Sequence, residues 1–190
     1  MPKLREHKKI MDKQLEKDLY FLRVCKEVSK ASKCLSRQIG SILVKDGCII
    51  STGYNGPPKG VKHCNERPPS HYCWINETAS CQINLWNFKN CPRTNLEFKS
   101  GTGLHLCQAA HSERNAIVQA ARNGISTLST TLYCYCPLPC KDCMVEIINA
   151  GIIEIVCLEG DDYDKYSRIL LNDAKIRIRQ IREKELLVKE

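Results

Sequence analysis

The sequence predicts an α/β fold built on one sheet that is at least partly parallel. In the second half of the chain, helical patterns alternate with strand patterns: a helix over 109–123, a strand over 130–136, a helix over 139–149 and a strand over 152–158. Such an alternation implies right-handed crossovers between parallel strands. Nearer the start, two β-rich runs flank Asp46-Gly47, a strong hairpin signal. The sheet is therefore expected to begin with an antiparallel pair.

The composition is typical of one compact domain with a substantial core. The chain has 190 residues, 43% of them apolar, so we expect a single domain over 1–190 with an irregular insertion at about 61–107. The formal charge of +8 suits anionic ligands, although the bases gather mainly in 3–17 and 175–189, where solvated helix faces explain them better. The charged start and the lack of a long apolar run predict a cytoplasmic protein without a membrane span.

The first half of the chain contains one helix and the hairpin. Apolar residues recur at helical spacing over 12–30, which predicts an opening helix packed against the rest of the fold. Strands are expected over 39–44 and 48–52, on either side of the turn. The next eight residues, 53–60, contain three glycines and two prolines, so they form a loop. Loops at strand ends often carry function.

The segment 61–107 has no sustained pattern of helix or strand. A segment this long without regular structure usually needs a cross-link. The chain has 13 cysteines and no secretion signal, which favours metal binding over disulfides. After this segment, the helix over 109–123 ends at Gly124, a suitable C-terminal cap. A short helix over 169–171 and a strand over 176–181 complete the expected elements.

Two short motifs carry the chemistry, His111-x-Glu113 and Pro139-Cys140-x-x-Cys143. A catalytic zinc ion takes three protein ligands and leaves its fourth position to water. Cysteines three residues apart share one face of a helix, and a helix N-terminus favours the thiolate form. Proline is tolerated in the first turn because the missing N–H has no partner there. With His111 at the start of another helix, the motifs predict an open zinc site.

Glu113 lies two residues after His111 and therefore points elsewhere at the start of the helix. A carboxylate beside the bound water can take its proton, deliver it to a ring nitrogen and later protonate a leaving amine. This combination is the signature of hydrolytic nucleobase deamination. A closed structural zinc site is the alternative, but it requires a fourth ligand and leaves Glu113 without a task.

These motifs resemble those of the cytidine deaminase superfamily, and more closely those of the deoxycytidylate (dCMP) deaminases. The similarity extends from about residue 19 to 158, and the segments that carry it are 32–37, 53–56, 111–117 and 139–143. It implies a three-layer α/β/α fold with a five-stranded mixed sheet and a zinc-stapled insertion. It also implies the conversion of dCMP and water to dUMP and ammonia, a step that supplies thymidylate synthesis. The loop and the insertion favour a nucleotide over a free nucleoside.

The resemblance also implies roles for individual residues. It makes His111, Cys140 and Cys143 the ligands of the catalytic zinc and Glu113 the proton shuttle. The substrate would be held by Asn55 at the sugar 3′ hydroxyl, by the backbone of Ser112 at the pyrimidine, by Ser36 and Arg37 at the 5′-phosphate, and by Tyr135 or Cys136 at the base. The choice between Tyr135 and Cys136 stays open because the segment before Cys140 is one residue longer than the common form. The usual alanine after the zinc histidine is Ser112 here.

A second, structural zinc is implied within the insertion. Its expected ligands are Cys34, Cys64, Cys91 and Cys107, in competition with His63, His105, Cys73 and Cys81. Four thiolates would make a closed tetrahedral site. The other cysteines lie in apolar or strand contexts and are expected to be small core residues; they are Cys25, Cys48, Cys134, Cys136 and Cys157.

Regulation and assembly follow from the resemblance alone. Many dCMP deaminases are hexamers activated by dCTP and inhibited by dTTP, so a homo-oligomer is expected, with a hexamer favoured. The effector site would include Asn55, Gly56, Lys59 and Arg122, and Mg²⁺ could accompany a triphosphate effector.

Other functions compete with dCMP deamination. One is deamination of another cytosine nucleotide or of bases in single-stranded nucleic acid. A nucleic-acid deaminase needs a basic, aromatic-lined channel, which an aromatic content of 6% disfavours. A zinc-stabilised interaction protein without catalysis could dispense with Glu113.

Overall fold

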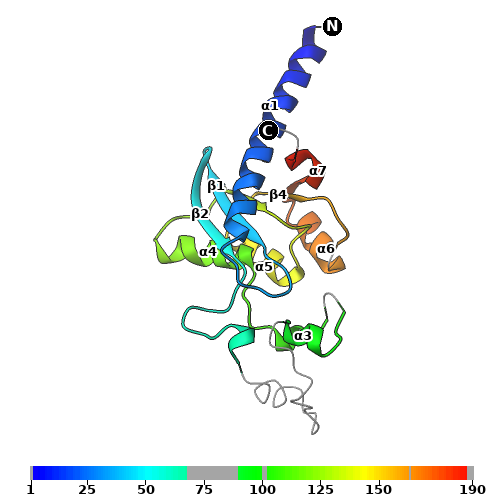
Figure 1. Ribbon diagram of the computed structural model, residues 1–190. Helices are drawn as coiled ribbons and strands as arrows, with labels where there is room; N and C mark the ends of the chain where they lie inside the picture. Colours follow the sequence, from blue (N-terminus) through cyan, green and yellow to red (C-terminus); the bar gives the residue numbers. More distant parts are fainter. Residues whose placement is uncertain (1, 68–89, 100–101, 163, 188–190) are drawn as a thin grey trace.

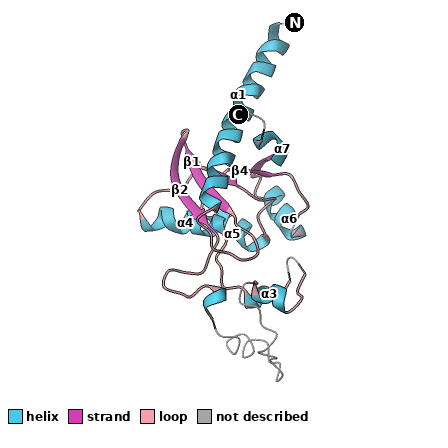
Figure 2. Cartoon of the chain, in the orientation of Figure 1, coloured by secondary structure: helices cyan, strands magenta, loops and turns pink. Residues whose placement is uncertain are grey.

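The computed structural model describes residues 2–67, 90–99, 102–162 and 164–187. Its centre is a five-stranded sheet in the order β2-β1-β3-β4-β5 (Figures 1 and 2). The strands are β1 (Gly40–Lys45), β2 (Cys48–Tyr54), β3 (Thr131–Cys134), β4 (Glu154–Leu158) and β5 (Arg177–Ile181). β1 is antiparallel to both of its neighbours, whereas β3, β4 and β5 are parallel. The predicted mixed sheet is confirmed.

The hairpin between β1 and β2 turns where the sequence predicts. Asp46 and Gly47 both have positive φ, 49° and 80°, as a two-residue turn that follows the strand twist requires. β2 continues two residues beyond the predicted strand, to Tyr54, so the expected loop over 53–60 begins later than predicted. The end of β2 therefore leads directly into the loop that contains Asn55.

Helices cover both faces of the sheet and complete the three layers. One face carries α1 (Pro2–Ser29), which starts well before the predicted residue 12, and α7 (Glu183–Leu186), which was not predicted. The other face carries α4 (Ser112–Arg122), α5 (Lys141–Asn149) and α6 (Lys165–Asp173). The N-terminal end of α1 projects beyond the sheet in Figure 1. No helix in the described residues has the length and apolar character needed to cross a membrane.

Strand alternation assigns the buried side chains to the two faces. On β3, Leu132 and Cys134 pack in the core under α4 and α5, whereas Tyr133 packs in the core under α1. Leu43 and Ile42 on β1 divide in the same way. Successive side chains of a strand point to opposite faces. Even-numbered residues from Leu132 to Cys136 therefore face α4 and α5, and odd-numbered ones face α1. This alternation decides which side chains reach the candidate site.

Two helices start later than the sequence predicts. Ala110 belongs to a short bridge with Gly56, with N···O distances of 2.9 and 3.1 Å, so α4 starts at Ser112 rather than at residue 109. Cys140 has an extended backbone with ψ of 167°, so α5 starts at Lys141 and Pro139 lies outside it. In the opposite sense, α6 is longer than predicted because Asp164 caps it and accepts a 2.9 Å hydrogen bond from the Tyr166 backbone N–H.

The described parts of the insertion contain only short helical turns, as the lack of a sequence pattern predicts. They are η1 (Cys64–Glu66), α3 (Pro92–Asn95) and η3 (Leu104–Leu106). In Figure 1 they lie together at one end of the sheet, beyond the loop that follows β2. Two of the competing ligands for the second metal, Cys73 and Cys81, lie outside the described residues.

Candidate active site

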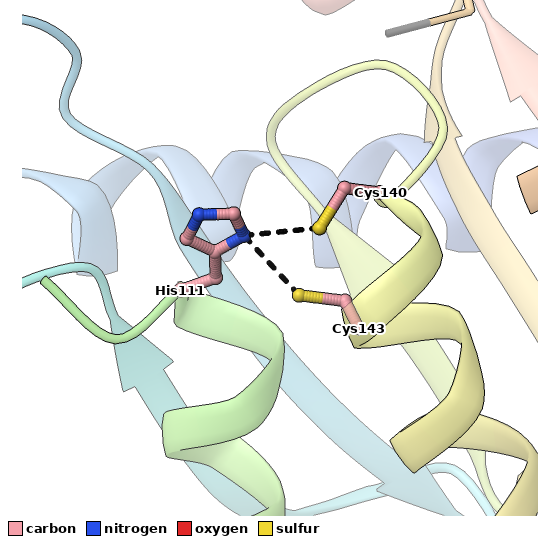
Figure 3. Close-up of side chains that lie close together, drawn as sticks. All are labelled: His111, Cys140 and Cys143. Carbon is pink, nitrogen blue, oxygen red and sulfur yellow. Dashed lines mark hydrogen bonds between the residues drawn. The ribbon is translucent and has the colours of Figure 1, made fainter. Parts of the chain in front are cut away.

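The N-termini of α4 and α5 converge at one point below the sheet. His111 is the N-cap of α4 and Cys140 is the N-cap of α5, and both have extended backbones. Cys143 lies in the first turn of α5 and is buried. Figure 3 shows the imidazole and the two thiols pointing toward one another from the two helices. The helix dipoles and free N–H groups of both helix starts favour negative charge here.

The spacing of the three donors fits a tetrahedral zinc ion. His111 Nδ1 lies 3.4 Å from Cys140 Sγ and 3.2 Å from Cys143 Sγ, and all three donor atoms lie within 4.8 Å of one another. Ordinary Zn–S and Zn–N bond lengths at tetrahedral angles place sulfur and nitrogen about 3.5 Å apart. The residues therefore fit a three-ligand zinc site.

The pKa values of the three donors show how strongly they interact. The hydrogen bond from Cys143, together with one from His111, lowers the pKa of Cys140 to about 4. The hydrogen bond to Cys140 and burial raise the pKa of Cys143, and the hydrogen bond to Cys140 raises the pKa of His111. Three donors this close compete for protons, and a shared cation removes that competition because it favours thiolate and neutral imidazole together.

Glu113 lies beside this triad and is not part of it. Glu113 is 3% exposed. A carboxylate oxygen of Glu113 lies within 4.8 Å of the Cys134 and Cys136 sulfur atoms, and Glu113 is not in the group formed by His111, Cys140 and Cys143. The Ser112 hydroxyl donates a 2.9 Å hydrogen bond to Glu113 Oε2. A carboxylate in this place can act as an acid or a base without occupying a metal coordination position.

A cavity of about 420 Å³ joins the triad to the residues that precede β1. Its lining includes His111, Glu113 and Cys140 together with Ser36, Arg37 and Asn55. This volume lies within the usual range for small-molecule sites. The cavity therefore brings together residues for which four different roles were predicted: metal binding, proton transfer, sugar binding and phosphate binding.

Asn55 has a structural role that the sequence did not indicate. Its Oδ1 accepts a hydrogen bond of 2.8 Å from the Ile39 backbone N–H, and its Nδ2 donates one of 2.7 Å to the Arg37 carbonyl. Because an amide NH₂ has two hydrogens, Asn55 can hold the segment of Ser36 and Arg37 and still donate to a ligand in the cavity.

Tyr135 does not reach the cavity. Its hydroxyl donates a 2.5 Å hydrogen bond to Glu183 of α7, and its ring packs with the core under α1. Tyr135 lies two residues after Tyr133 and therefore on the same face of the sheet, away from α4 and α5. Of the two residues left open for the base, only Cys136 lines the cavity in the described part of the chain.

Arg93 is a cavity residue that sequence reasoning missed. It comes from α3 in the insertion, and its guanidinium is held by hydrogen bonds of 2.6 Å to the Thr102 carbonyl and 3.4 Å to the Lys99 carbonyl. The only sequence signal was its position two residues after Cys91, in a segment already expected to fold around a metal.

The four cysteines expected to bind a second metal lie around one small cavity of about 40 Å³. Burial, followed by Cys91 and Cys34, raises the pKa of Cys64; burial also raises the pKa of Cys107, with smaller contributions from Cys34 and Cys91. The donor set and its burial suit a structural zinc, but the sulfurs are more widely spaced than the His111 triad, since no three of them lie within 4.8 Å of one another.

The competing ligands and the core cysteines fall in different places. His63 lines the same small cavity, whereas His105 packs edge-on against Phe98 at 5.9 Å. Among the expected core cysteines, Cys25, Cys134 and Cys157 are buried, but Cys48 is exposed because it starts an edge strand directly after the turn.

The residues expected to bind an effector lie near opposite ends of α4. Asn55 and Gly56 lie near its start, where Gly56 pairs with Ala110. Arg122 is the last residue of α4, about 15 Å further along the helix axis. Lys59 is exposed in the loop after Gly56. Within this chain the structure does not bring Arg122 to the loop.

A three-layer α/β/α fold with one histidine and two cysteines grouped as candidate metal donors, and with a carboxylate beside them in a cavity, is the arrangement expected of a zinc-binding deaminase fold. The sequence model described as the cytidine and deoxycytidylate deaminase zinc-binding region matches residues 15–159. The chain belongs to this family.

Individual relatives agree with the family assignment. The chain is 34% identical over 176 residues to the deoxycytidylate deaminase of Enterobacteria phage T4, covering 87% of this chain and 90% of that one. It is 32% identical over 163 residues to the deoxycytidylate deaminase of Schizosaccharomyces pombe, covering 86% of this chain. The chain spans 43% of that relative's length and 44% of the corresponding enzyme of Saccharomyces cerevisiae.

A solved structure shares the fold. The dCMP deaminase of cyanophage S-TIM5, crystallised in complex with dCMP and dUMP, superimposes with a TM-score of 0.58 at 20% identity. The match covers 85% of this chain and 94% of that one.

Proposed function

We propose that this chain is a zinc-dependent deaminase that hydrolyses the amino group of dCMP, giving dUMP and ammonia. The observation that carries the proposal is the shared cavity, which is lined both by His111, Cys140 and Glu113 and by the basic segment of Arg37. The deoxycytidylate deaminases among its relatives and the nucleotide-bound S-TIM5 structure support the choice of substrate.

His111, Cys140 and Cys143 would hold the zinc ion. When bound there, zinc supplies Lewis-acid chemistry that makes water nucleophilic near neutral pH. Glu113 takes a proton from the attacking water and delivers it to N3 of the cytosine ring. It then takes the remaining proton from the hydroxyl group added at C4 and delivers it to the departing amine, which leaves as ammonia while C4 becomes a carbonyl. Both protons come from the water, and the carboxylate ends the cycle in the form in which it started.

Other residues of the same cavity would hold the 5′-phosphate and the sugar. Arg37 and Arg93 contribute guanidinium groups, which match phosphate geometry and stay charged. Ser36 lies beside Arg37 and can donate a hydroxyl hydrogen bond. Asn55, which already holds the Arg37 carbonyl, would bind the sugar 3′ hydroxyl, and Cys136 would lie beside the base.

Further parts of the proposal rest on the resemblance to dCMP deaminases. They are a structural zinc at Cys34, Cys64, Cys91 and Cys107, a hexameric assembly, activation by dCTP with Mg²⁺, inhibition by dTTP, and a role in supplying dUMP for thymidylate synthesis. The shared small cavity supports the structural zinc. The position of Gly56 beside Ala110, one residue before His111, supports communication between an effector loop and the site.

The test is a substitution of Glu113 by glutamine. It should retain zinc and the fold but lower dCMP turnover by about 10²- to 10⁴-fold, the usual contribution of general acid–base catalysis. Glu146→Gln is the matched control, because it removes the same charge from α5, where Glu146 pairs with Arg114 at 2.8 Å outside the cavity. Wild-type turnover in Glu113→Gln would refute the mechanism.

A substrate panel identifies the ligand. We expect dCMP to be deaminated in preference to deoxycytidine, CMP, dCTP and a short single-stranded oligonucleotide, each assayed with and without dCTP and dTTP. Preference for the oligonucleotide would overturn the nucleotide assignment, and a substrate curve that neither effector changes would remove the regulatory part.

A further inference from the structure

A chain of buried hydroxyl groups leads from the sheet to the Glu113 carboxylate. Ser112 Oγ donates to Glu113 Oε2 at 2.9 Å, and Ser41 Oγ lies 2.7 Å from Ser112 Oγ. Ser41 Oγ is in turn 3.2 Å from Cys134 Sγ. Ser41, Ser112 and Cys134 are each 0% exposed, so water does not compete for these bonds.

The direction of the hydrogen bonds follows from the bond that Ser112 donates to Glu113. Each hydroxyl has one hydrogen, so the Ser112 oxygen must accept from Ser41, and the Ser41 oxygen must then accept from the thiol of Cys134. Ser112 and Ser41 therefore each accept one hydrogen bond and donate one within the chain of groups.

The sheet holds the far end of this chain rigidly. Ser41 and Cys134 are paired residues of β1 and β3, so both side chains face α4 by strand parity. The start of α4 lies close to the sheet because Gly53 has no side chain: a Cβ there would lie 2.3 Å from the Ser112 carbonyl oxygen. The distance between Ser41 and Ser112 is thus set by backbone packing.

We propose that Ser112 and Ser41 are positioning residues for the proton shuttle of the deaminase reaction. Their hydrogen bonds hold Oε2 of Glu113, which leaves the other oxygen, Oε1, for the proton transfers. The inference rests on the proposed function and deepens it. It also gives a task to the Ser112 side chain, whose backbone alone was expected to contact the substrate.

The experiment measures kcat and KM for dCMP in Ser112→Ala, Ser41→Ala and the double variant. We expect kcat of Ser112→Ala to fall about 10-fold, as loss of a hydrogen bond to a charged group implies. KM should stay unchanged, because the buried Ser112 side chain is not among the described residues that line the cavity. Ser41→Ala should lower kcat about 3-fold, and the double variant should match Ser112→Ala, because Ser41 acts only through Ser112.

Ser51→Ala is the matched control. Ser51 is also a buried sheet serine bonded to α4, through a 2.6 Å hydrogen bond to the Ala116 carbonyl, but it does not contact Glu113. It should destabilise the fold as much as Ser41→Ala does and leave kcat unchanged. Zinc content and thermal denaturation are measured for every variant. Alanine is a strong helix former and Ser112 is the first residue of α4, so the fold should accept Ser112→Ala. Ser41→Ala provides an independent variant.

The outcomes separate this inference from the proposed function. If the wild-type protein deaminates dCMP and the kcat of Ser112→Ala is within about twofold of the wild-type kcat, the positioning role alone is overturned. Additive losses in the double variant, or an equal loss in Ser51→Ala, would assign the effect to stability and overturn it as well. Wild-type protein that deaminates no substrate of the panel would overturn the proposed function and this inference with it.

Discussion

Replacing Arg179 by alanine should destabilise the fold through one buried acidic residue. Asp18 of α1 has a side chain 2% exposed and receives hydrogen bonds of 2.7 and 3.0 Å from the Arg179 guanidinium, which also contacts Glu154. Without Arg179, Asp18 retains two neutral donors in the structure, the Tyr133 hydroxyl and the Gln14 amide, each at 2.9 Å. A buried carboxylate that loses its charged partner costs about 3–5 kcal/mol of stability.

The assay is thermal unfolding followed by circular dichroism. For a chain of 190 residues, each kcal/mol corresponds to about 2–4 °C, so Arg179→Ala should lower Tm by roughly 6–20 °C. Arg177→Ala is the control on the same strand: it also pairs with Glu154, at 3.3 Å, but its side chain is 68% exposed, so the loss should be about 0–1 kcal/mol. Melting temperatures of the two variants within about 2 °C of each other would refute the burial argument.

Three further substitutions test other parts of the structure. Arg93→Ala should lower kcat/KM for dCMP about 10-fold or more, as loss of a charged hydrogen bond implies, and leave deoxycytidine turnover unchanged; equal losses on both substrates would remove Arg93 from the phosphate subsite. Metal analysis should find about two zinc ions per wild-type chain and one in the Cys91→Ser, Cys107→Ser variant, whereas one ion in the wild type would refute the structural site. Gly53→Ala should impair both stability and deamination because the added Cβ would lie 2.3 Å from the α4 backbone. Gly56→Ala should be stable because no heavy atom lies within 4 Å of the position of its Cβ. Equal stability of these two variants would contradict the close packing of α4 on β2.

The metal donors could be predicted because their chemistry depends on local spacing. His111, Cys140 and Cys143 each occupy a helix start or first turn, and helix starts are signalled by residues a few positions apart. The sequence placed those starts two or three residues too early, at Ala109 and Pro139. Ala110 is kept out of the helix by a β-bridge to Gly56. Local sequence patterns do not predict this bridge because it joins distant parts of the chain.

The base pocket could not be predicted because it depends on which face of the sheet a strand residue occupies. Tyr135 and Cys136 are adjacent and point to opposite faces of the sheet, and period-2 alternation alone does not say which face carries α4. The structure resolves this by pairing β3 with β1, which places Cys134 opposite Ser41. Arg93 was missed for a similar reason, since the insertion that carries it has no periodic pattern.

The sequence alone predicted the class of fold, the hairpin turn and the helix–strand alternation, and it named the three candidate metal donors that the structure groups together. These are properties of short segments, where backbone preference and ligand chemistry act between near neighbours. Only the tertiary structure decided that Cys136 and Arg93 line the cavity and that Ser41 contacts Ser112 from 71 residues away. Those contacts depend on strand register and on the close approach of α4 to the sheet at Gly53, which are set by packing of the whole domain.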